Sequence, residues 1–155
     1  MTQSSDLLES TIGVATDAPL VRLRASRGDI VRHTEGSYDV LICPADPEGL
    51  SLSERATIAL RAAELSGHAA LAAHYRDLAA RRGGPPPGAR LETILAHVAL
   101  VTKHPRSAAS SNIAALQGAG LSPGDIVALT QIVAFISYQV RAAVGLGLLA
   151  HEMAS

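Results

Sequence analysis

Aromatic residues are scarce in this sequence: three tyrosines, one phenylalanine and no tryptophan make up 3% of it. Hydrophobic residues still account for 48% of the 155 residues, so alanine, leucine, isoleucine and valine must build the core. Runs of β-branched and aromatic residues between turns are also rare, which argues against an all-β fold. These absences predict an all-α fold in one domain, residues 1–155, whose small side chains let the helices approach closely.

The sequence also has a single cysteine and almost equal numbers of acidic and basic residues. Cys43 is the single cysteine, so the chain cannot form an internal disulfide. The formal net charge is −1 and no basic block stands out, so a nucleic-acid partner is not expected. The first ten residues contain no basic segment followed by an apolar run. We therefore expect no signal peptide and a cytoplasmic location.

The longest apolar segment, residues 122–150, predicts a buried final helix. Ser122, Pro123 and Asp125 are typical of a helix start. A membrane span would need roughly 20 predominantly apolar residues. Asp125 and Arg141 enclose only part of this segment, and polar residues interrupt it, so we favour a soluble core helix and no membrane partner. The interrupting residues are Thr130, Gln131, Ser137 and Gln139.

Residues 50–82 predict the core of the fold, a pair of helices that breaks near Gly67. Ser51 or Ser53 can cap the first helix, because a serine oxygen accepts from the free N–H groups of the first turn. Glu54 follows where a carboxylate suits the positive end of the helix dipole. Further helices are expected at residues 6–13, 17–26, 29–41, 91–104 and 110–118, with Asp17 and Asp29 as caps.

The second helix of the pair contains His74, which lies one helical step from Leu71 and Leu78 and borders their apolar face. His68 precedes it by six residues, so the two rings do not share a face. Metal ligands on a helix prefer a spacing of three or four, and no carboxylate cluster completes a set, so we expect no metal and no cofactor. His74 is either a hydrogen-bonded interior residue or a proton-transfer group. His68 is either a helix-start or pocket-edge residue, or assists His74.

The motifs of this stretch also resemble a known family. LSLSER at residues 50–55 and AAH at residues 72–74 are similar to the core segment of the carboxymuconolactone decarboxylase and alkylhydroperoxidase-D superfamily, nearest its peroxidase-related branch. Members carry a helix that opens with LSxxER and leads to Cys-x-x-Cys-x-x-x-His. His74 matches the end of that motif, whereas Gly67 and Ala70 stand where the cysteines belong. The resemblance implies a compact multi-helix alkylhydroperoxidase-D-like domain that forms homo-dimers, trimers or hexamers.

Members with the motif have an antioxidant activity: a thiolate pair reduces the peroxide, and a histidine and an acid move the protons. A chain without the pair cannot run this cycle, so the resemblance implies at most peroxidase-related or decarboxylase-like proton transfer at His74, assisted by His68 and Glu54. The alternative is a non-catalytic ligand-binding or assembly subunit that partners a paralogue with both cysteines. Cys43 lies outside the motif, and we expect it to be a buried or half-buried small side chain.

Overall fold

The computed structural model describes residues 6–15 and 18–154. The regular structure in these residues is helical and includes no strand, which confirms the all-α prediction. In chain order the elements are α1 (Leu7–Ile12), α2 (Pro19–Ala25), α3 (Gly28–Ile42), α4 (Leu52–Leu65), α5 (Ala69–Arg81), α6 (Ala89–Lys103), the 3₁₀ turn η1 (Pro105–Ser107), α7 (Ser110–Gly118) and α8 (Pro123–Ala154).

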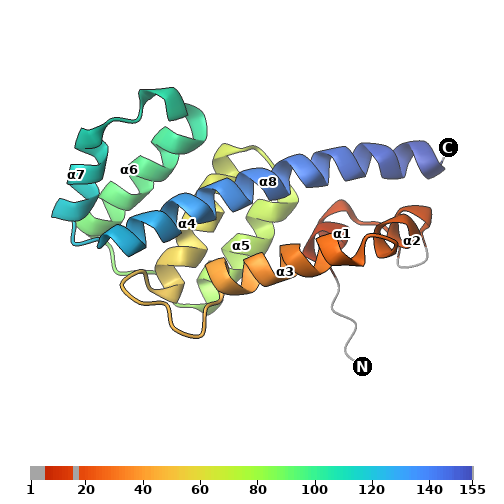
Figure 1. The fold of residues 1–155 in the computed structure, drawn as a ribbon, viewed down its shortest axis with the longest axis horizontal. Coiled ribbons are helices and arrows are strands. Elements are labelled where there is room, and N and C mark those ends of the chain that lie inside the picture. Colours follow the sequence, from red (N-terminus) through yellow and green to blue (C-terminus); the bar gives the residue numbers. More distant parts are fainter. Residues whose placement is uncertain (1–5, 16–17, 155) are drawn as a thin grey trace.

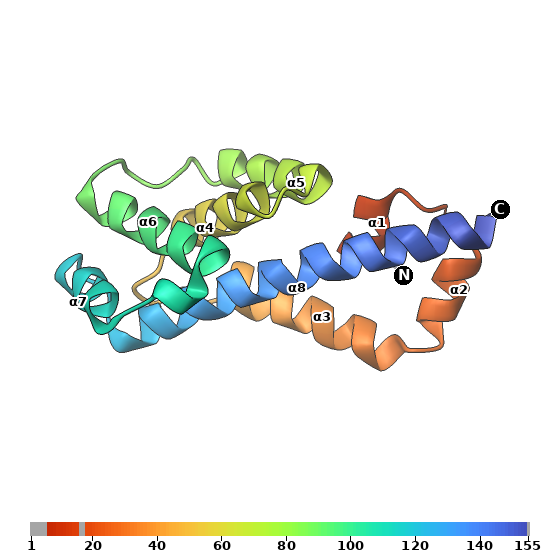
Figure 2. The same cartoon turned by 90° about the horizontal axis from the view of Figure 1, so that it is seen from above.

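Helix α8 runs along the whole length of the molecule, and the other helices are arranged around it (Figure 1). Helices α6 and α7 lie beside its first turns, whereas α1 and α2 lie beside its last turns (Figure 1). Seen from above, the α4–α5 pair lies on one side of α8, and α3 runs antiparallel to α8 on the other (Figure 2). This arrangement brings α1, α3, α5 and α8 around one region, which contains the candidate site.

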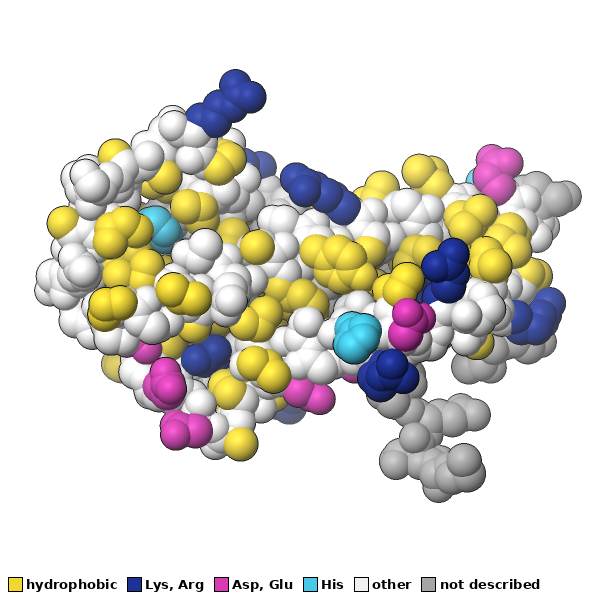
Figure 3. All heavy atoms as spheres, viewed as in Figure 1, with side chains coloured by type: hydrophobic (Ala, Val, Ile, Leu, Met, Phe, Trp, Pro, Cys, Tyr) yellow, Lys and Arg dark blue, Asp and Glu magenta, His cyan; other side chains and the backbone are white. Residues whose placement is uncertain are grey.

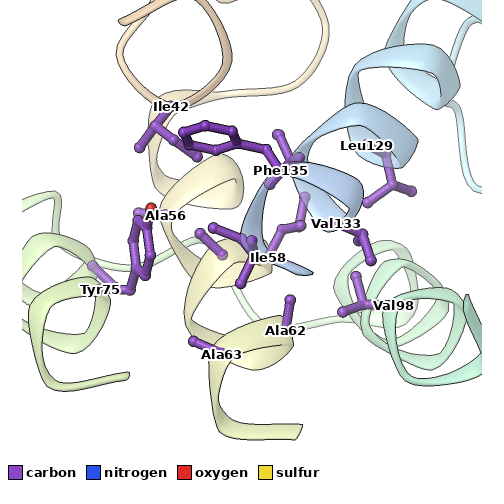
Figure 4. Packing of buried hydrophobic residues seen from close by; sticks show 14 of the residues in the cluster. Ile42, Ala56, Ile58, Ala62, Ala63, Tyr75, Val98, Leu129, Val133 and Phe135 are labelled. Carbon is purple, nitrogen blue, oxygen red and sulfur yellow. The ribbon is translucent and has the colours of Figure 1, made fainter. Parts of the chain in front are cut away.

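The core forms where α4 meets α8, α5 and α6. Ile58 and Ala62 of α4 point toward Val133 of α8 and Val98 of α6, and Tyr75 of α5 closes the other side (Figure 4). All five side chains are buried. Because the buried side chains of α4 include several alanines, neighbouring helices can approach it closely. This is the close packing that the low content of aromatic residues predicts.

The start of α4 is held by the residues of the LSxxER pattern. Ser51 and Glu54 form a reciprocal capping box: the Ser51 hydroxyl accepts from the Glu54 N–H, and Glu54 Oε2 accepts from the Ser51 N–H at 2.9 Å. Arg55 is buried and donates to the carbonyl oxygens of Leu50, Leu41 and Pro47 at 2.8, 2.8 and 3.1 Å. The pattern therefore fixes the loop between α3 and α4.

Two details of the first helices differ from the sequence-based expectation. Helix α3 begins at Gly28, and the Arg27 carbonyl accepts from the N–H groups of Ile30 and Val31, so Asp29 lies in the first turn instead of capping it. In that position its charge still complements the helix dipole. Asp17, the other expected cap, lies outside the described residues.

The prediction of a buried final helix is wrong for the outer side of α8. By length and composition this helix could cross a membrane, yet only 33% of its most apolar 18-residue window is buried. Its inner side packs in the core, while Arg141 and several apolar side chains are exposed. One of these side chains, Tyr138, still contacts a neighbouring helix, because its hydroxyl lies 3.1 Å from Thr34 Oγ1 of α3. The inner side also buries Asp125 and Gln139, as expected for packing on protein. The large exposed apolar side chains of α8 are Val127, Tyr138, Val144, Leu148, Leu149 and Met153.

Candidate functional site

A cavity of about 420 Å³ opens between α1, α3, α5 and α8. This volume lies in the range of pockets that bind small molecules. Its wall is polar and apolar in nearly equal parts, and Leu7 and Leu8 of α1 belong to the apolar part. The lining residues are Asp6, Leu7, Leu8, Ser10, Thr34, Glu35, Tyr38, Asp39, His74 and Gln139.

Helix α3 supplies the largest share of this wall. Thr34, Glu35, Tyr38 and Asp39 lie on one side of the helix, because residues four apart are neighbours on its surface. Helix α1 is held in place by Asp6, whose carboxylate accepts from the Leu8 N–H at 2.9 Å and pairs with Arg24 of α2. The cavity is thus built from three chain segments and the single His74 of α5.

The central contact of the site joins Tyr38 and His74. The Tyr38 hydroxyl lies 3.0 Å from His74 Nε2, a hydrogen bond between α3 and α5. Tyr75 supports both rings from the core: its ring is stacked on Tyr38 at 6.4 Å between centroids and meets His74 edge to face at 5.0 Å. Two of the three tyrosines of the chain are therefore found at this contact: Tyr38 forms the hydrogen bond, and Tyr75 packs against both rings.

Burial sets the protonation state of this pair. It is the main cause that lowers the pKa of His74, and the charge of Arg81 lowers it further while Asp77 opposes the change. Burial also raises the pKa of Tyr38 to about 12, with a contribution from the Cys43 sulfur and opposition from Arg82. A neutral imidazole therefore lies next to a protonated phenol at neutral pH.

Gln139 forms the inner end of the cavity. Its side chain is 1% exposed, and its Oε1 accepts from the Tyr75 hydroxyl at 2.6 Å. Burial raises the pKa of Tyr75 far above its usual value, so this hydroxyl stays a donor. This hydrogen bond ties Gln139 of α8 to Tyr75 of α5 and holds the glutamine side chain in the cavity wall.

Among the residues that sequence reasoning singled out, only His74 lines this cavity. His68 is the N-cap of α5, and its Nδ1 accepts from the Leu71 N–H at 3.3 Å. Glu54 completes the capping box of α4 through Oε2, and its other oxygen, Oε1, accepts from Arg90 Nε at 2.7 Å. Burial alone would raise the pKa of Glu54, but the hydrogen bonds from Arg90 and Ser51 lower it. The structure does not bring the three residues together.

Cys43 is exposed, so the expectation of a buried or half-buried thiol is wrong. Helix α3 ends at Ile42, and Cys43 is its C-cap, at the point where the chain turns into the loop. Its sulfur accepts from Arg82 at 3.0 Å and does not line the cavity.

Tyr38 and Gln139 are the functional candidates that sequence reasoning missed. A usable signal existed for Tyr38: it is one of three tyrosines and belongs to the polar side of α3 formed by Thr34, Glu35 and Asp39. Gln139 carried a weaker signal, as a polar residue inside the most apolar helix. Neither signal showed which other helix would face these residues.

Within residues 6–15 and 18–154, no group of three or more His, Cys, Asp and Glu side chains could hold a metal ion. The polar atoms of the cavity are suited to hydrogen bonding and proton transfer. Comparison with known proteins adds no identity, since the chain matches no family model, no curated protein and no solved structure.

Proposed function

We propose that this chain is a relative of the carboxymuconolactone decarboxylase and alkylhydroperoxidase-D superfamily that lacks the redox cysteines, and that its cavity catalyses proton transfer on a small molecule. The observation that carries the proposal is the 3.0 Å hydrogen bond between Tyr38 and His74 in the wall of the 420 Å³ cavity. The all-α fold and the LSxxER start of α4 support the relationship.

In the proposed reaction Tyr38 and His74 act as one unit. The Tyr38 oxygen receives a proton from a carbon acid in the cavity while its own proton passes to His74 Nε2. The same path in reverse returns the proton to a neighbouring carbon, so the substrate is isomerised and no electron acceptor is needed. His74 suits the step because its pKa is lowered, so the ring is neutral and can accept a proton.

The test uses α-angelica lactone, a small neutral lactone whose double bond moves by proton transfer alone. Nuclear magnetic resonance in D₂O would follow deuterium uptake and isomerisation with the full-length protein. We expect acceleration over buffer, and a loss of about 10²-fold or more in His74→Gln and in Tyr38→Phe. His104→Gln is the matched control, since His104 is exposed and lies outside the cavity wall. Equal rates in the wild type and His74→Gln would refute the catalytic role.

The second candidate is a non-catalytic ligand-binding or assembly subunit that partners a paralogue with the cysteine pair. The observation in its favour is that the single thiol, Cys43, lies outside the cavity. Binding of the lactone at the cavity without any acceleration of its exchange would favour this candidate. Hydroperoxide turnover that disappears in Cys43→Ser would contradict both candidates, because each assumes that Cys43 has no redox role.

We further propose that the protein is a cytoplasmic homo-oligomer that associates through the outer face of α8, defined as Val127, Ala134, Tyr138 and Leu148. All four are exposed. Hydrophobic side chains line the length of α8 in the space-filling view (Figure 3). A shallow groove of about 750 Å³ between α3 and α8 adjoins this face, and its lining includes the apolar residues Val40, Leu41 and Ala134 beside the polar Arg32 and His33. A second copy could insert an apolar ridge into such a groove.

A further inference from the structure

We infer that two copies of this chain pair along helix α8 in antiparallel directions, about a two-fold axis between Tyr138 and Arg141. This inference rests on the proposed oligomer and adds the orientation and the register of the second copy. Three features of α8 carry it: the spacing of its exposed residues, the charges among them and the groove that adjoins them.

Exposed residues of α8 follow the heptad spacing of a coiled coil. Successive members lie alternately four and three residues apart, and each of them is exposed. Residues on the opposite side of the helix, such as Leu129, Ile132 and Ile136, are fully buried. The exposed row is about 38 Å long at 1.5 Å per residue, which is enough for an extended helix pair. This row, the α8 stripe, consists of Val127, Gln131, Ala134, Tyr138, Arg141, Gly145, Leu148 and Glu152.

The charges of the α8 stripe favour the antiparallel direction. In a parallel pair in register, each residue faces its own counterpart, so Arg141 would meet Arg141 and Glu152 would meet Glu152. Like charges at such short range repel. In an antiparallel pair centred between Tyr138 and Arg141, each guanidinium meets the Tyr138 ring of the second copy, which is a favourable cation–π contact. Glu152 then faces the uncharged Val127 instead of a second carboxylate.

Tyr138 is held in place for this contact. Its hydroxyl lies 3.1 Å from Thr34 Oγ1 of α3, and its ring stacks on Phe135 at 6.2 Å between centroids. Tyr138 is nevertheless 42% exposed. The ring therefore offers an oriented aromatic surface to a cation and loses little rotamer freedom when a second copy binds.

The same register fills the groove between α3 and α8. It places Gly145 of the second copy over Ala134, where two small residues let the helices approach closely. The space beside Gly145 is open, since a Cβ at this position would have no neighbouring atom within 4 Å. It also places Leu148 of the second copy over Gln131, which lines the groove together with Ala134 and Val40. Leu148 is 67% and Val40 68% exposed, so this contact covers the two most exposed large apolar side chains of the described residues.

Disulfide cross-linking tests the orientation in a Cys43→Ser background, which removes the exposed native thiol. Positions 134 and 145 lie about 16 Å apart along one helix, too far for a disulfide within one chain. We expect the double variant Ala134→Cys/Gly145→Cys to form about tenfold or more covalent dimer, on non-reducing electrophoresis, than either single variant. Val127→Cys/Ala134→Cys is the matched control, because both of its cysteines lie on the α8 stripe but do not meet in this register.

Sedimentation velocity tests the central contact. Arg141→Glu should raise the dissociation constant of the dimer about fivefold or more, because it replaces the cation over the Tyr138 ring by an anion. Arg106→Glu is the matched control, since Arg106 is exposed on η1 and lies outside the α8 stripe. An unchanged dissociation constant in Arg141→Glu would overturn the register.

The remaining outcomes separate this inference from the proposed oligomer. If the single variants cross-link as readily as the double variant, the copies pair in parallel, and the antiparallel arrangement is wrong while the oligomer stands. If the wild type sediments as an oligomer and none of the variants cross-links, α8 does not pair with α8, and the arrangement is again wrong. A monomeric wild type would refute the arrangement and the oligomer together.

Discussion

His74 is the residue whose chemical state decides what this site can do. Burial lowers its pKa below the ordinary value of 6.5, and the same cause lowers the pKa of buried His97 on α6. Between the lowered folded value and 6.5 the unfolded chain binds more protons than the folded one. Each histidine therefore contributes stability that is complete above pH 6.5 and is lost as the pH falls through that window.

The first prediction at this scale concerns stability against pH. The free energy of unfolding, measured by urea denaturation from pH 7.5 to 5, should decrease toward acid, and His74→Gln should flatten that decrease. Tyr38→Phe is the control: it keeps the His74 ring buried and should retain most of the slope while costing roughly 0.5–1.5 kcal/mol for the lost hydrogen bond. An unchanged slope in His74→Gln would show that burial does not perturb this ring.

At the scale of single elements, α4 shows which residues of the LSxxER pattern stabilise the start of the helix. Two serines could cap this helix by sequence, and the structure assigns the cap to Ser51 with Glu54 as its reciprocal partner. We predict that Ser51→Ala lowers the free energy of unfolding by about 0.5–2 kcal/mol, as expected for loss of an N-cap. Ser53→Ala, the matched control inside the first turn, should cost less than half as much. Equal losses, measured by thermal and urea denaturation, would contradict the assignment.

Elements near strong local signals could be predicted from the sequence. Asp6, Ser51 and Ser122 each begin a helix because a short polar side chain accepts from the first-turn N–H groups, and this rule needs only neighbours. Gly67 ends the α4 turn with a positive φ of 77°, which glycine tolerates without strain. These local rules explain why the helix boundaries were found within a few residues.

The candidate site was less accessible to sequence reasoning. The Tyr38–His74 contact joins residues 36 positions apart, and Gln139 reaches the same cavity from the last helix. No periodicity within one helix reveals which face of another helix it meets. His68 illustrates the same limit: its spacing from His74 was known, but only the structure shows its ring bound to the Leu71 N–H.

For the molecule as a whole, the most notable surface is the outer face of α8, where apolar side chains remain exposed to solvent. A helix with one exposed apolar side gains stability by burying it, at about 25 cal/mol per Å². We therefore predict an oligomer at micromolar concentration in sedimentation velocity, and a shift toward monomer in Leu148→Lys. Leu148 is 67% exposed, so the substitution should leave the fold intact, which circular dichroism would verify.

Ile113→Lys is the matched control for this prediction. Ile113 lies on α7, is 39% exposed, and does not belong to the outer face of α8. It should leave the sedimentation coefficient unchanged. A monomeric wild type, or an equal effect of both substitutions, would refute α8 as the interface.

The whole account depends on His74 facing an open cavity as a neutral base. The most direct measurement is the titration of its ring by nuclear magnetic resonance, with the Cε1 signal assigned through His74→Gln and recorded with and without α-angelica lactone. The account predicts a midpoint below 6.5 and a change of the signal when the lactone is present. A titration midpoint at or above 6.5, together with a Cε1 signal that does not change when the lactone is added, would contradict the account.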